Sequence, residues 1–242
     1  MTVDKICEAV RCCIDEEDAN ASSLANLTTL GSDSTLMNNI IKNKIPAALR
    51  WVTLYAPSDA LSGGSSGGGG GGGSTTLDII AEETSGGSGD SEIQISGNTI
   101  TPRKTLVRVV RVKGSSWSRA ILGDSLISED SDEYLQLSDT HGAAATNDRP
   151  QAALVNTKQK KVEVWPHTNN SFTLTYIRAL TDSDLSGLNV GTTNVNLPDL
   201  VETSFIYYLA YLLCCAYGDG RAKSMFEIAT MNLGRTDDKQ RQ

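Results

Sequence analysis

The chain has 242 residues, of which 39% are hydrophobic, 21% are charged and only 5% are aromatic. A chain of this length and composition can bury one or two modest cores but not an aromatic-rich one. Asp and Glu total 29 against 21 for Lys and Arg, so the formal net charge is −8. Because cationic side chains drive binding to phosphates, this charge argues against a protein that coats nucleic acid, and any DNA contact should be local.

The cysteines indicate a protein of a reducing compartment, and the longest apolar segment indicates a buried helix instead of a membrane span. The five cysteines are Cys7, the adjacent pair Cys12 and Cys13, and the adjacent pair Cys214 and Cys215. Their number is odd, and their spacing is not that of a secreted disulfide framework. The N-terminus lacks the features of a signal peptide. The longest apolar run, Phe205 to Tyr217, is shorter than the roughly 20 residues that cross a bilayer, so we expect a buried helix.

Helical periodicity predicts two helices near the N-terminus. The first spans residues 4–14, where apolar residues recur at steps of four. The second runs from Leu36 to Tyr55 with Ser34 or Asp33 as its cap, and Pro46 should kink or divide it. Residues 62–74 are all Gly or Ser, a composition that is typical of a flexible linker.

Short alternating apolar segments predict strands in the middle of the chain. We expect strands at 77–80, 93–95, 106–112, 134–137, 152–155, 161–165 and 172–177. Residues 85–89 should form a long hairpin tip between the first two. Because no helical pattern separates the strands, an antiparallel barrel or sandwich is favoured over a doubly wound parallel sheet.

Two helices are predicted near the C-terminus. Asn196 is a candidate N-cap with Pro198 in the first turn, and Gly218 should end this helix. Asp219 can cap the second helix. The apolar face of that helix comprises Ala222, Met225, Phe226, Ala229 and Leu233. The helix–strand–helix order indicates the α+β class.

The segment Gly123-Asp124-Ser125-Leu126 spells the nucleophile motif of the GDSL esterases and lipases. A seryl nucleophile needs a base, normally a histidine oriented by a carboxylate. That family places an Asp-x-x-His pair near the end of its domain, but neither His141 nor His167 follows an aspartate at this spacing. We interpret the segment as a turn between strands, with an esterase that uses Ser125 as the alternative.

No catalytic, cofactor or metal site is predicted elsewhere. Adjacent cysteines on a helix point in different directions, whereas the ligands of a closed zinc site converge. Each of the two histidines is isolated in a polar segment. Buried free thiols and loop histidines are the expected outcome.

Charge is concentrated in two neighbouring segments. The cations are Arg103, Lys104, Arg108, Arg111, Lys113 and Arg119, and the anions are Glu129, Asp130, Asp132 and Glu133. The simplest interpretation is a solvated strand face, and the functional one is a surface that pairs with a neighbouring subunit or faces a DNA channel. A head-to-tail ring can use one complementary pair repeatedly, because its interface joins two different patches.

The order of these segments resembles the head-to-tail connector proteins of tailed bacteriophages, especially the adaptor or ring proteins below the portal of short-tailed, crAss-like phages. The resemblance covers most of residues 30–235. It rests on the helix at 36–55, on Ile100-Thr101-Pro102-Arg103-Lys104 and the strand after it with Trp117-Ser118-Arg119, on 149–155 and 162–166, and on 197–211 with 222–233. The Gly/Ser tract departs from the pattern, as does Thr101, where the family usually has Leu.

The resemblance implies a helical bundle formed by the N- and C-terminal helices, with a β-rich, barrel-like or sandwich-like antiparallel insertion. The expected segments are N-terminal helices at 1–61, the linker at 62–74, the insertion at 75–196, the C-terminal helix pair at 197–235 and a polar tail at 236–242. The tail is expected to fray or reach toward a neighbour.

The function that the resemblance implies is that of a structural virion protein, with no enzymatic activity and no cofactor. The chain would form a homo-oligomeric ring, expected to be a dodecamer, in the neck between portal and tail, where DNA passes through the lumen. Its partners would be copies of itself, the portal protein and other connector or tail proteins, with no membrane, and assembly would occur in the host cytoplasm. Another virion component, such as a tail-tube or head-fibre subunit, is the remaining alternative.

Overall fold

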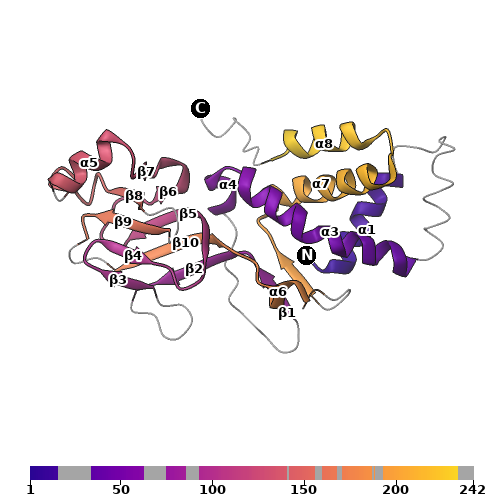
Figure 1. Cartoon of the computed structure of the whole chain (residues 1–242), viewed down its shortest axis with the longest axis horizontal. Helices are drawn as coiled ribbons and strands as arrows, with labels where there is room; N and C mark the ends of the chain where they lie inside the picture. The colour runs from indigo at the N-terminus through magenta and orange to yellow at the C-terminus, as the bar shows by residue number, and fades with distance from the viewer. Residues whose placement is uncertain are drawn as a thin grey trace. The chain divides into compact units, whose positions relative to one another are not determined.

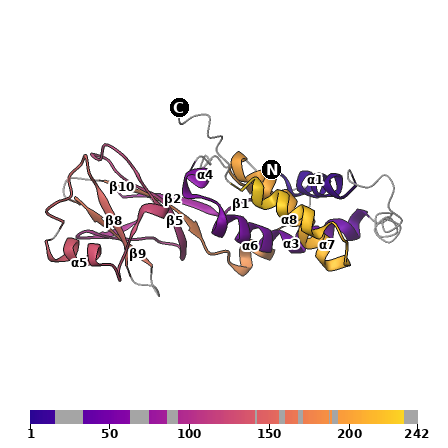
Figure 2. The same ribbon diagram turned by 90° about the horizontal axis from the view of Figure 1, so that it is seen from above.

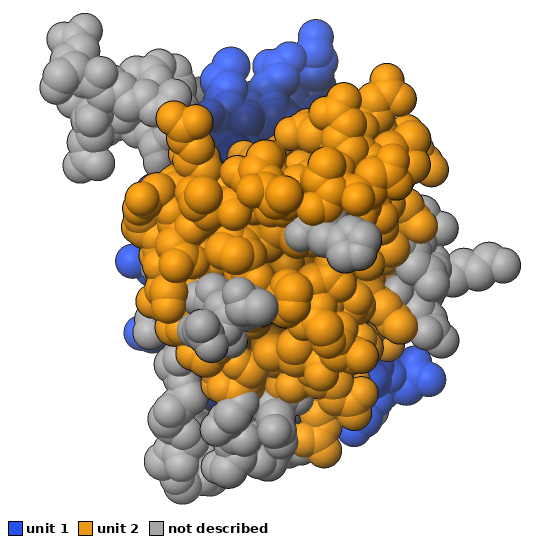
Figure 3. Space-filling view, turned by 90° about the vertical axis from the view of Figure 1, so that its left-hand side faces the viewer, with its two compact units in different colours: residues 1–78, 180–242 blue, residues 79–179 orange. Residues whose placement is uncertain are grey.

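The computed structural model describes residues 1–15, 34–62, 75–85, 93–140, 142–155, 160–167, 171–186, 188 and 193–233. It combines helices with several sheets, so the predicted α+β class is confirmed. The chain forms two compact units, coloured separately in Figure 3. Unit 1 comprises residues 1–78 with 180–242, and unit 2 comprises residues 79–179. Most of the predicted Gly/Ser linker and the whole polar tail at 236–242 lie outside the described residues.

Unit 1 contains helices from both ends of the chain (Figures 1 and 2). They are α1 (Val3–Asp15), α3 (Ser34–Tyr55), α4 (Ser58–Ser62), α6 (Asp182–Ser186), α7 (Asp199–Tyr217) and α8 (Ala222–Met231). α7 packs against α1, α3, α4 and α8, and Phe205 and Leu209 on α7 are fully buried. The apolar stripe predicted for α1 is also buried, at Ile6 and Val10. α7 is therefore the central helix of this unit.

The helix boundaries agree with the sequence at some positions and differ at others. Pro46 does not divide α3, which is one helix. The side chains of Asp33 and Ser34, the predicted caps, lie outside the described residues. Gly218 ends α7 with a φ of 68°, as predicted, because glycine adopts the left-handed conformation without strain. The prediction of Asn196 as the N-cap is wrong, since α7 begins after Pro198 and the Asn196 amide donates to Asp78 at 3.0 Å.

A short parallel pair also belongs to unit 1. β1 (Thr75–Asp78) pairs with β11 (Thr193–Asn196), residue for residue. The strand predicted at 77–80 is therefore wrong in its extent, because the chain leaves β1 at Asp78 and begins another strand at Ile80. Sequence alternation alone does not show which partner a strand pairs with, and here two different partners divide one apolar run.

Unit 2 consists of two sheets and a short helix (Figure 1). The first has the order β2 (Ile80–Thr84), β10 (Phe172–Arg178), β5 (Leu106–Gly114), β6 (Ile121–Leu122). The second has the order β3 (Gln94–Ser96), β4 (Thr99–Thr101), β9 (Lys161–Trp165), β8 (Gln151–Val155), β7 (Ile127–Ser128). Neighbouring strands are antiparallel except β7 and β8, which are parallel.

One buried cluster contains residues of both sheets. Phe172, Leu174 and Tyr176 alternate along β10 and share this cluster with Val162 and Val164 of β9, as the alternation in the sequence predicts. The Trp117 ring meets Phe172 edge-on, with ring centroids 5.5 Å apart. A Cβ atom at Gly114 would lie 2.9 Å from this indole, so only glycine fits there without a shift.

The strand predicted at 134–137 is wrong, because these residues belong to helix α5 (Asp132–Asp139). The Ser131 hydroxyl caps the helix by accepting a hydrogen bond from the Tyr134 backbone N–H at 3.2 Å. Asp132 and Glu133 occupy the first turn, where the helix dipole favours negative charge. The N-cap and the helix dipole together favour a helix here over the strand that the weak alternation predicted.

Candidate interaction surface of the β-rich unit

Three of the predicted cations share one face of β5. The register places Lys113, Arg111 and Arg108 opposite Thr173, Thr175 and Ile177 of β10. These β10 residues alternate along their strand and so point to one side of the sheet. An irregularity at Val110, which the register skips, brings position 108 to the same side as 111. We call Arg108, Arg111 and Lys113 the cationic face.

The three side chains of the cationic face differ in their partners. Arg108 forms an ion pair with Asp124, with 2.5 Å between Nη2 and Oδ1. The Lys113 ammonium donates to the backbone carbonyl of Trp117. Arg111 is exposed. Arg111 is therefore the member of the face whose charge is most available to a second molecule.

The predicted cations Arg103 and Lys104 lie before β5 and are exposed, while their backbones hold a buried acid. The Arg103 N–H donates to Oε2 of Glu83 at 3.0 Å, and the Lys104 N–H donates to the Tyr176 hydroxyl at 3.2 Å. That hydroxyl donates to the other oxygen of Glu83 at 2.5 Å. Burial, and then the carboxylate beside it, raise the pKa of Tyr176 well above its usual range. Glu83 was not predicted as a buried acid, because an acid next to Glu82 is typical of a solvated strand.

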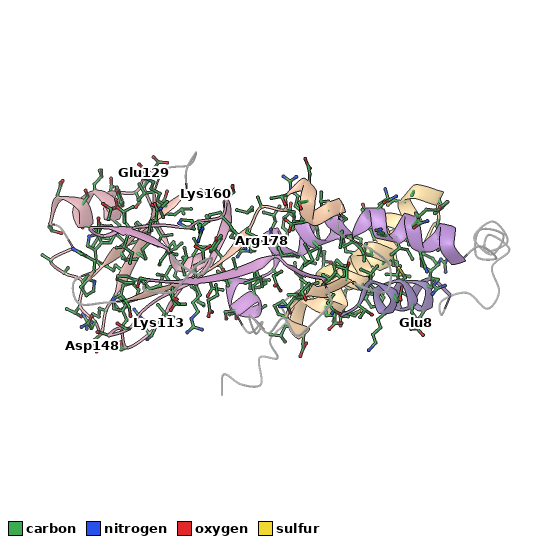
Figure 4. The ribbon with its side chains drawn as sticks, turned by 90° about the horizontal axis from the view of Figure 1, so that it is seen from below. Glu8, Lys113, Glu129, Asp148, Lys160 and Arg178 are labelled. Atoms are coloured by element: carbon green, nitrogen blue, oxygen red, sulfur yellow. The ribbon has the colours of Figure 1, made fainter. Side chains whose placement is uncertain are left out.

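The predicted acids form a continuous exposed segment. Glu129 and Asp130 lie in the turn after β7, and Asp132 and Glu133 begin α5. We call these four residues the acidic segment. Figure 4 shows Glu129 and Lys113 on opposite sides of unit 2. Lys113 and Glu129 are therefore well separated on this unit, whereas Arg108 is paired locally with Asp124.

Behind the acidic segment, α5 is anchored by a tyrosine. The Tyr134 hydroxyl donates to Oε2 of Glu163 on β9 at 3.2 Å, and the Tyr134 ring packs against Trp165. Burial, and then the Glu163 carboxylate, raise the pKa of Tyr134. This contact fixes the helix that carries Asp132 and Glu133 to the sheet.

A cavity of about 630 Å³ lies within unit 2 and brings together residues that the sequence analysis considered for different reasons. It is lined by the predicted cation Arg119, by the predicted acid Glu133 and by Ser125. The remaining lining residues are Ala120, Ile121, Leu122, Asp124, Leu126, Ile127, Ser128, Ser131, Pro150, Gln151 and Ala152. The cavity therefore combines both signs of charge with hydroxyls and apolar side chains.

One lining group stands out by its environment. The Oε1 atom of Gln151, at the start of β8, is buried and has no hydrogen-bond partner among the described residues. A buried acceptor without a donor costs about 1–3 kcal/mol, so such groups usually find water or a ligand. Neither Arg119 nor Glu133 forms an ion pair within the described part of the chain, and both are exposed. The cavity therefore offers two uncompensated charges, while the Oε1 atom of Gln151, unpaired among the described residues, is buried behind its lining.

The predicted turn at 123–126 is confirmed as a short connection between strands. Gly123–Ser125 form a 3-10 turn, η2, between β6 and β7, and Ser125 is exposed. No histidine belongs to the lining of the cavity beside Ser125, and Asp124 pairs with Arg108. His167 is exposed, and His141 lies outside the described residues. Among the residues that line this cavity, none is the imidazole base that an esterase mechanism on Ser125 requires.

The described residues contain no group of three or more His, Cys, Asp or Glu side chains that could hold a metal ion. Cys7 and Cys214 are buried, and burial raises the pKa of each to about 11. Cys12 and Cys215 are exposed. A thiol with a raised pKa is protonated at neutral pH and is a poor nucleophile or metal ligand.

α7 differs from the sequence-based expectation in its length. It has 19 residues and, by length and composition, is apolar enough to cross a membrane, which the shorter apolar run at 205–217 did not suggest. Core helices pass the same test, and Val201, Phe205 and Leu213 of α7 are buried within the protein. The packing of α7 against α1, α3 and α8 favours the core interpretation.

Unit 1 also carries an aromatic cluster that was not predicted from the sequence. Trp51 of α3 stacks on Tyr208 of α7, with centroids 4.1 Å apart and planes inclined by 4°. Phe226 of α8 packs beside Tyr211, with ring centroids 5.1 Å apart. Tyr55 continues the cluster and is 66% exposed. The spacing of Trp51 and Tyr55, one helical turn apart, was the available signal.

No protein-family model matches the chain, and no curated protein matches it in sequence.

Proposed function

We propose that the protein is a structural subunit of a bacteriophage virion, in which copies form a head-to-tail connector ring below the portal. The proposal follows from the resemblance of the segment order to that of the head-to-tail connector proteins. The proposed fold is a helical bundle built by both chain ends, with residues 79–179 inserted as a β sandwich. The packing of α1, α3 and α8 around α7 and the buried cluster shared by two sheets support that fold.

The observation that carries the proposal is the separation of charge on unit 2. Lys113 of the cationic face and Glu129 of the acidic segment lie on opposite sides of the unit (Figure 4). A closed ring of identical subunits joins two different patches of each subunit at every interface. Complementary patches on opposite sides satisfy this condition, and their attraction favours the head-to-tail register over orientations in which like charges meet.

Charge reversal tests the ring. Arg111→Glu and Asp130→Lys should each lower the fraction of assembled protein, because each places like charges across the interface. The double variant should recover assembly, since it restores complementarity with the signs exchanged. Arg50→Glu on α3 is the matched control, because Arg50 is an exposed cation of unit 1. Light scattering gives the mass, and negative-stain images show whether the assemblies are rings.

The same experiment is repeated with portal protein present if the isolated chain stays monomeric. Single reversals that leave assembly unchanged would remove the two charged patches from the interface. Failure to form rings even on the portal would remove the connector proposal itself.

A further inference from the structure

We infer that the cavity of unit 2 binds an extended peptide segment of a partner protein, which adds as a strand at the edge of β6. This inference goes beyond ring formation, because it assigns each subunit a binding site for a partner's peptide, which shares only Glu133 with the acidic segment. The segment would carry side chains of both signs with small apolar residues between them.

The cavity is bordered by the terminal strands of both sheets. β6 is the last strand of the first sheet and β7 is the last strand of the second, and all four of their residues line the cavity. The two edges lie close together in Figure 1. One edge of a terminal strand presents N–H and C=O groups toward the outside of its sheet, and an extended peptide satisfies them by strand addition.

The side chains that line the cavity carry both signs of charge. Glu133 attracts a basic side chain, and Arg119 attracts an acidic one, since neither is neutralised by an ion pair within the described residues. Leu122, Leu126 and Pro150 offer apolar contact between these polar points.

Other ligand classes fit this lining less well. Glu133 repels the phosphates of a nucleic acid, and Asp124 is already paired with Arg108. Arg119 is the one cation of the lining that could attract them. No aromatic side chain belongs to the lining, so a sugar ring or a nucleobase finds no stacking surface in the cavity. A peptide uses the backbone edge and the charges together.

A displayed library of random linear peptides tests the inference on the full chain. Peptides are selected on the wild-type protein after depletion on Ser125→Trp, in which the larger side chain fills the cavity. We expect selected peptides to bind the wild-type chain and to bind Ser125→Trp at least about tenfold more weakly. Glu133→Gln should weaken the peptides that carry a basic residue, and Arg50→Glu on unit 1 should change nothing.

Backbone N-methylation distinguishes strand addition from other modes of binding. Selected peptides methylated at alternate amides should lose binding, because the methyl groups remove the donors of the ladder. Hydrogen exchange at the amides of β6 should slow when the unmodified peptide is bound. Circular-dichroism melts check that Ser125→Trp is folded, and Ser128→Trp, at another exposed serine of the lining, replaces it as the depletion variant if it is not.

Three outcomes would overturn the inference. The first is a selection that yields no peptide with a preference for the wild-type cavity. The second is binding that survives methylation at both sets of alternate amides. The third is self-association that needs no peptide and disappears in Ser125→Trp, which would make a second copy of the chain the occupant. None of these outcomes affects the charge-reversal test of the ring, so the two proposals fail independently.

Discussion

At the scale of single residues, Arg221 connects three helices of unit 1. Its guanidinium pairs with the carboxylate of Asp219, with 2.6 Å between Nη2 and Oδ2, and it also donates to the backbone carbonyl of Ile14. The side chains of the pair are only 12% and 8% exposed. The turn between α7 and α8 is thereby tied to the last turn of α1. Neither the pair nor its link to α1 is visible in the sequence, because Ile14 is distant along the chain.

Removing the arginine should destabilise the fold strongly. Arg221→Ala leaves a buried carboxylate and a helix-end carbonyl without their donor, and breaking such a pair typically costs about 3–5 kcal/mol. Urea unfolding measures this loss. The matched control is Lys223→Ala, because Lys223 is 88% exposed and its contact with Glu227 spans 3.8 Å. The control should change the unfolding free energy by less than about 0.5 kcal/mol. Equal losses in both variants would contradict the anchoring role.

Acidification should weaken the pair between Asp219 and Arg221. Hydrogen bonds from the Arg221 side chain, more than any other cause, lower the pKa of Asp219 below its usual value. A carboxyl with a lowered folded-state pKa stabilises the protein above the pKa of the unfolded chain, about 3.9, and this contribution disappears as pH falls through the folded-state pKa. The stability difference between wild type and Asp219→Asn should therefore shrink on acidification below pH of about 4. Urea midpoints across pH measure it, and a difference that stays constant would contradict the coupling.

Ser125 has a direct chemical test. Among the residues that line its cavity, none is an imidazole base, so we expect no hydrolysis of a short ester such as p-nitrophenyl acetate above that of Ser128→Ala, a hydroxyl variant in the same lining. Ser125→Ala should leave this background and the thermal melt unchanged. Hydrolysis by the wild type that disappears only in Ser125→Ala would support the esterase alternative.

At the scale of elements, the strands with clear alternation were predictable and the short ones were not. Val162 and Val164 of β9, and Phe172, Leu174 and Tyr176 of β10, alternate along their strands and lie in the cluster shared by both sheets, so a period of two is visible in these sequences. β6 and β7 have two residues each, which is too short for any periodicity. The irregularity at Val110 depends on the register with β10, so the shared face of Arg108 and Arg111 could not be predicted either.

The α5 helix shows how a cap decides an ambiguous segment. Ser131→Ala removes the hydroxyl that accepts from the Tyr134 N–H, and losing an N-cap typically costs about 1 kcal/mol. We expect a loss of that size in urea unfolding. Ser138→Ala in the same helix is exposed and should have little effect. Equal effects at both serines would show that the cap does not hold the helix.

At the scale of the whole molecule, the sequence predicted which segments are helical or extended but not which of them meet. The two C-terminal helices and the N-terminal helices have clear periodicity, yet their common packing on α7 joins residues from opposite ends of the chain. The cavity depends on the parallel pairing of β7 with β8. Ser125 and Glu133 attracted attention separately, one as a catalytic motif and one as a charge, and only the pairing places them on one cavity.

The division into two units predicts that residues 79–179 fold without the rest of the chain. Their buried cluster draws Val112, Val164 and Leu174 from both sheets, so the segment contains a complete core of its own. A domain of this size can bury enough apolar surface to unfold cooperatively. The isolated segment should therefore show a single transition in urea, with tryptophan fluorescence and far-ultraviolet circular dichroism coinciding. The matched control is the same segment with Leu174→Ala, which should lose about 2–5 kcal/mol because the cavity it creates lies in this core. A transition that is absent, or one that Leu174→Ala does not move, would mean that the β-rich unit depends on the helices and is not an independently folding insertion.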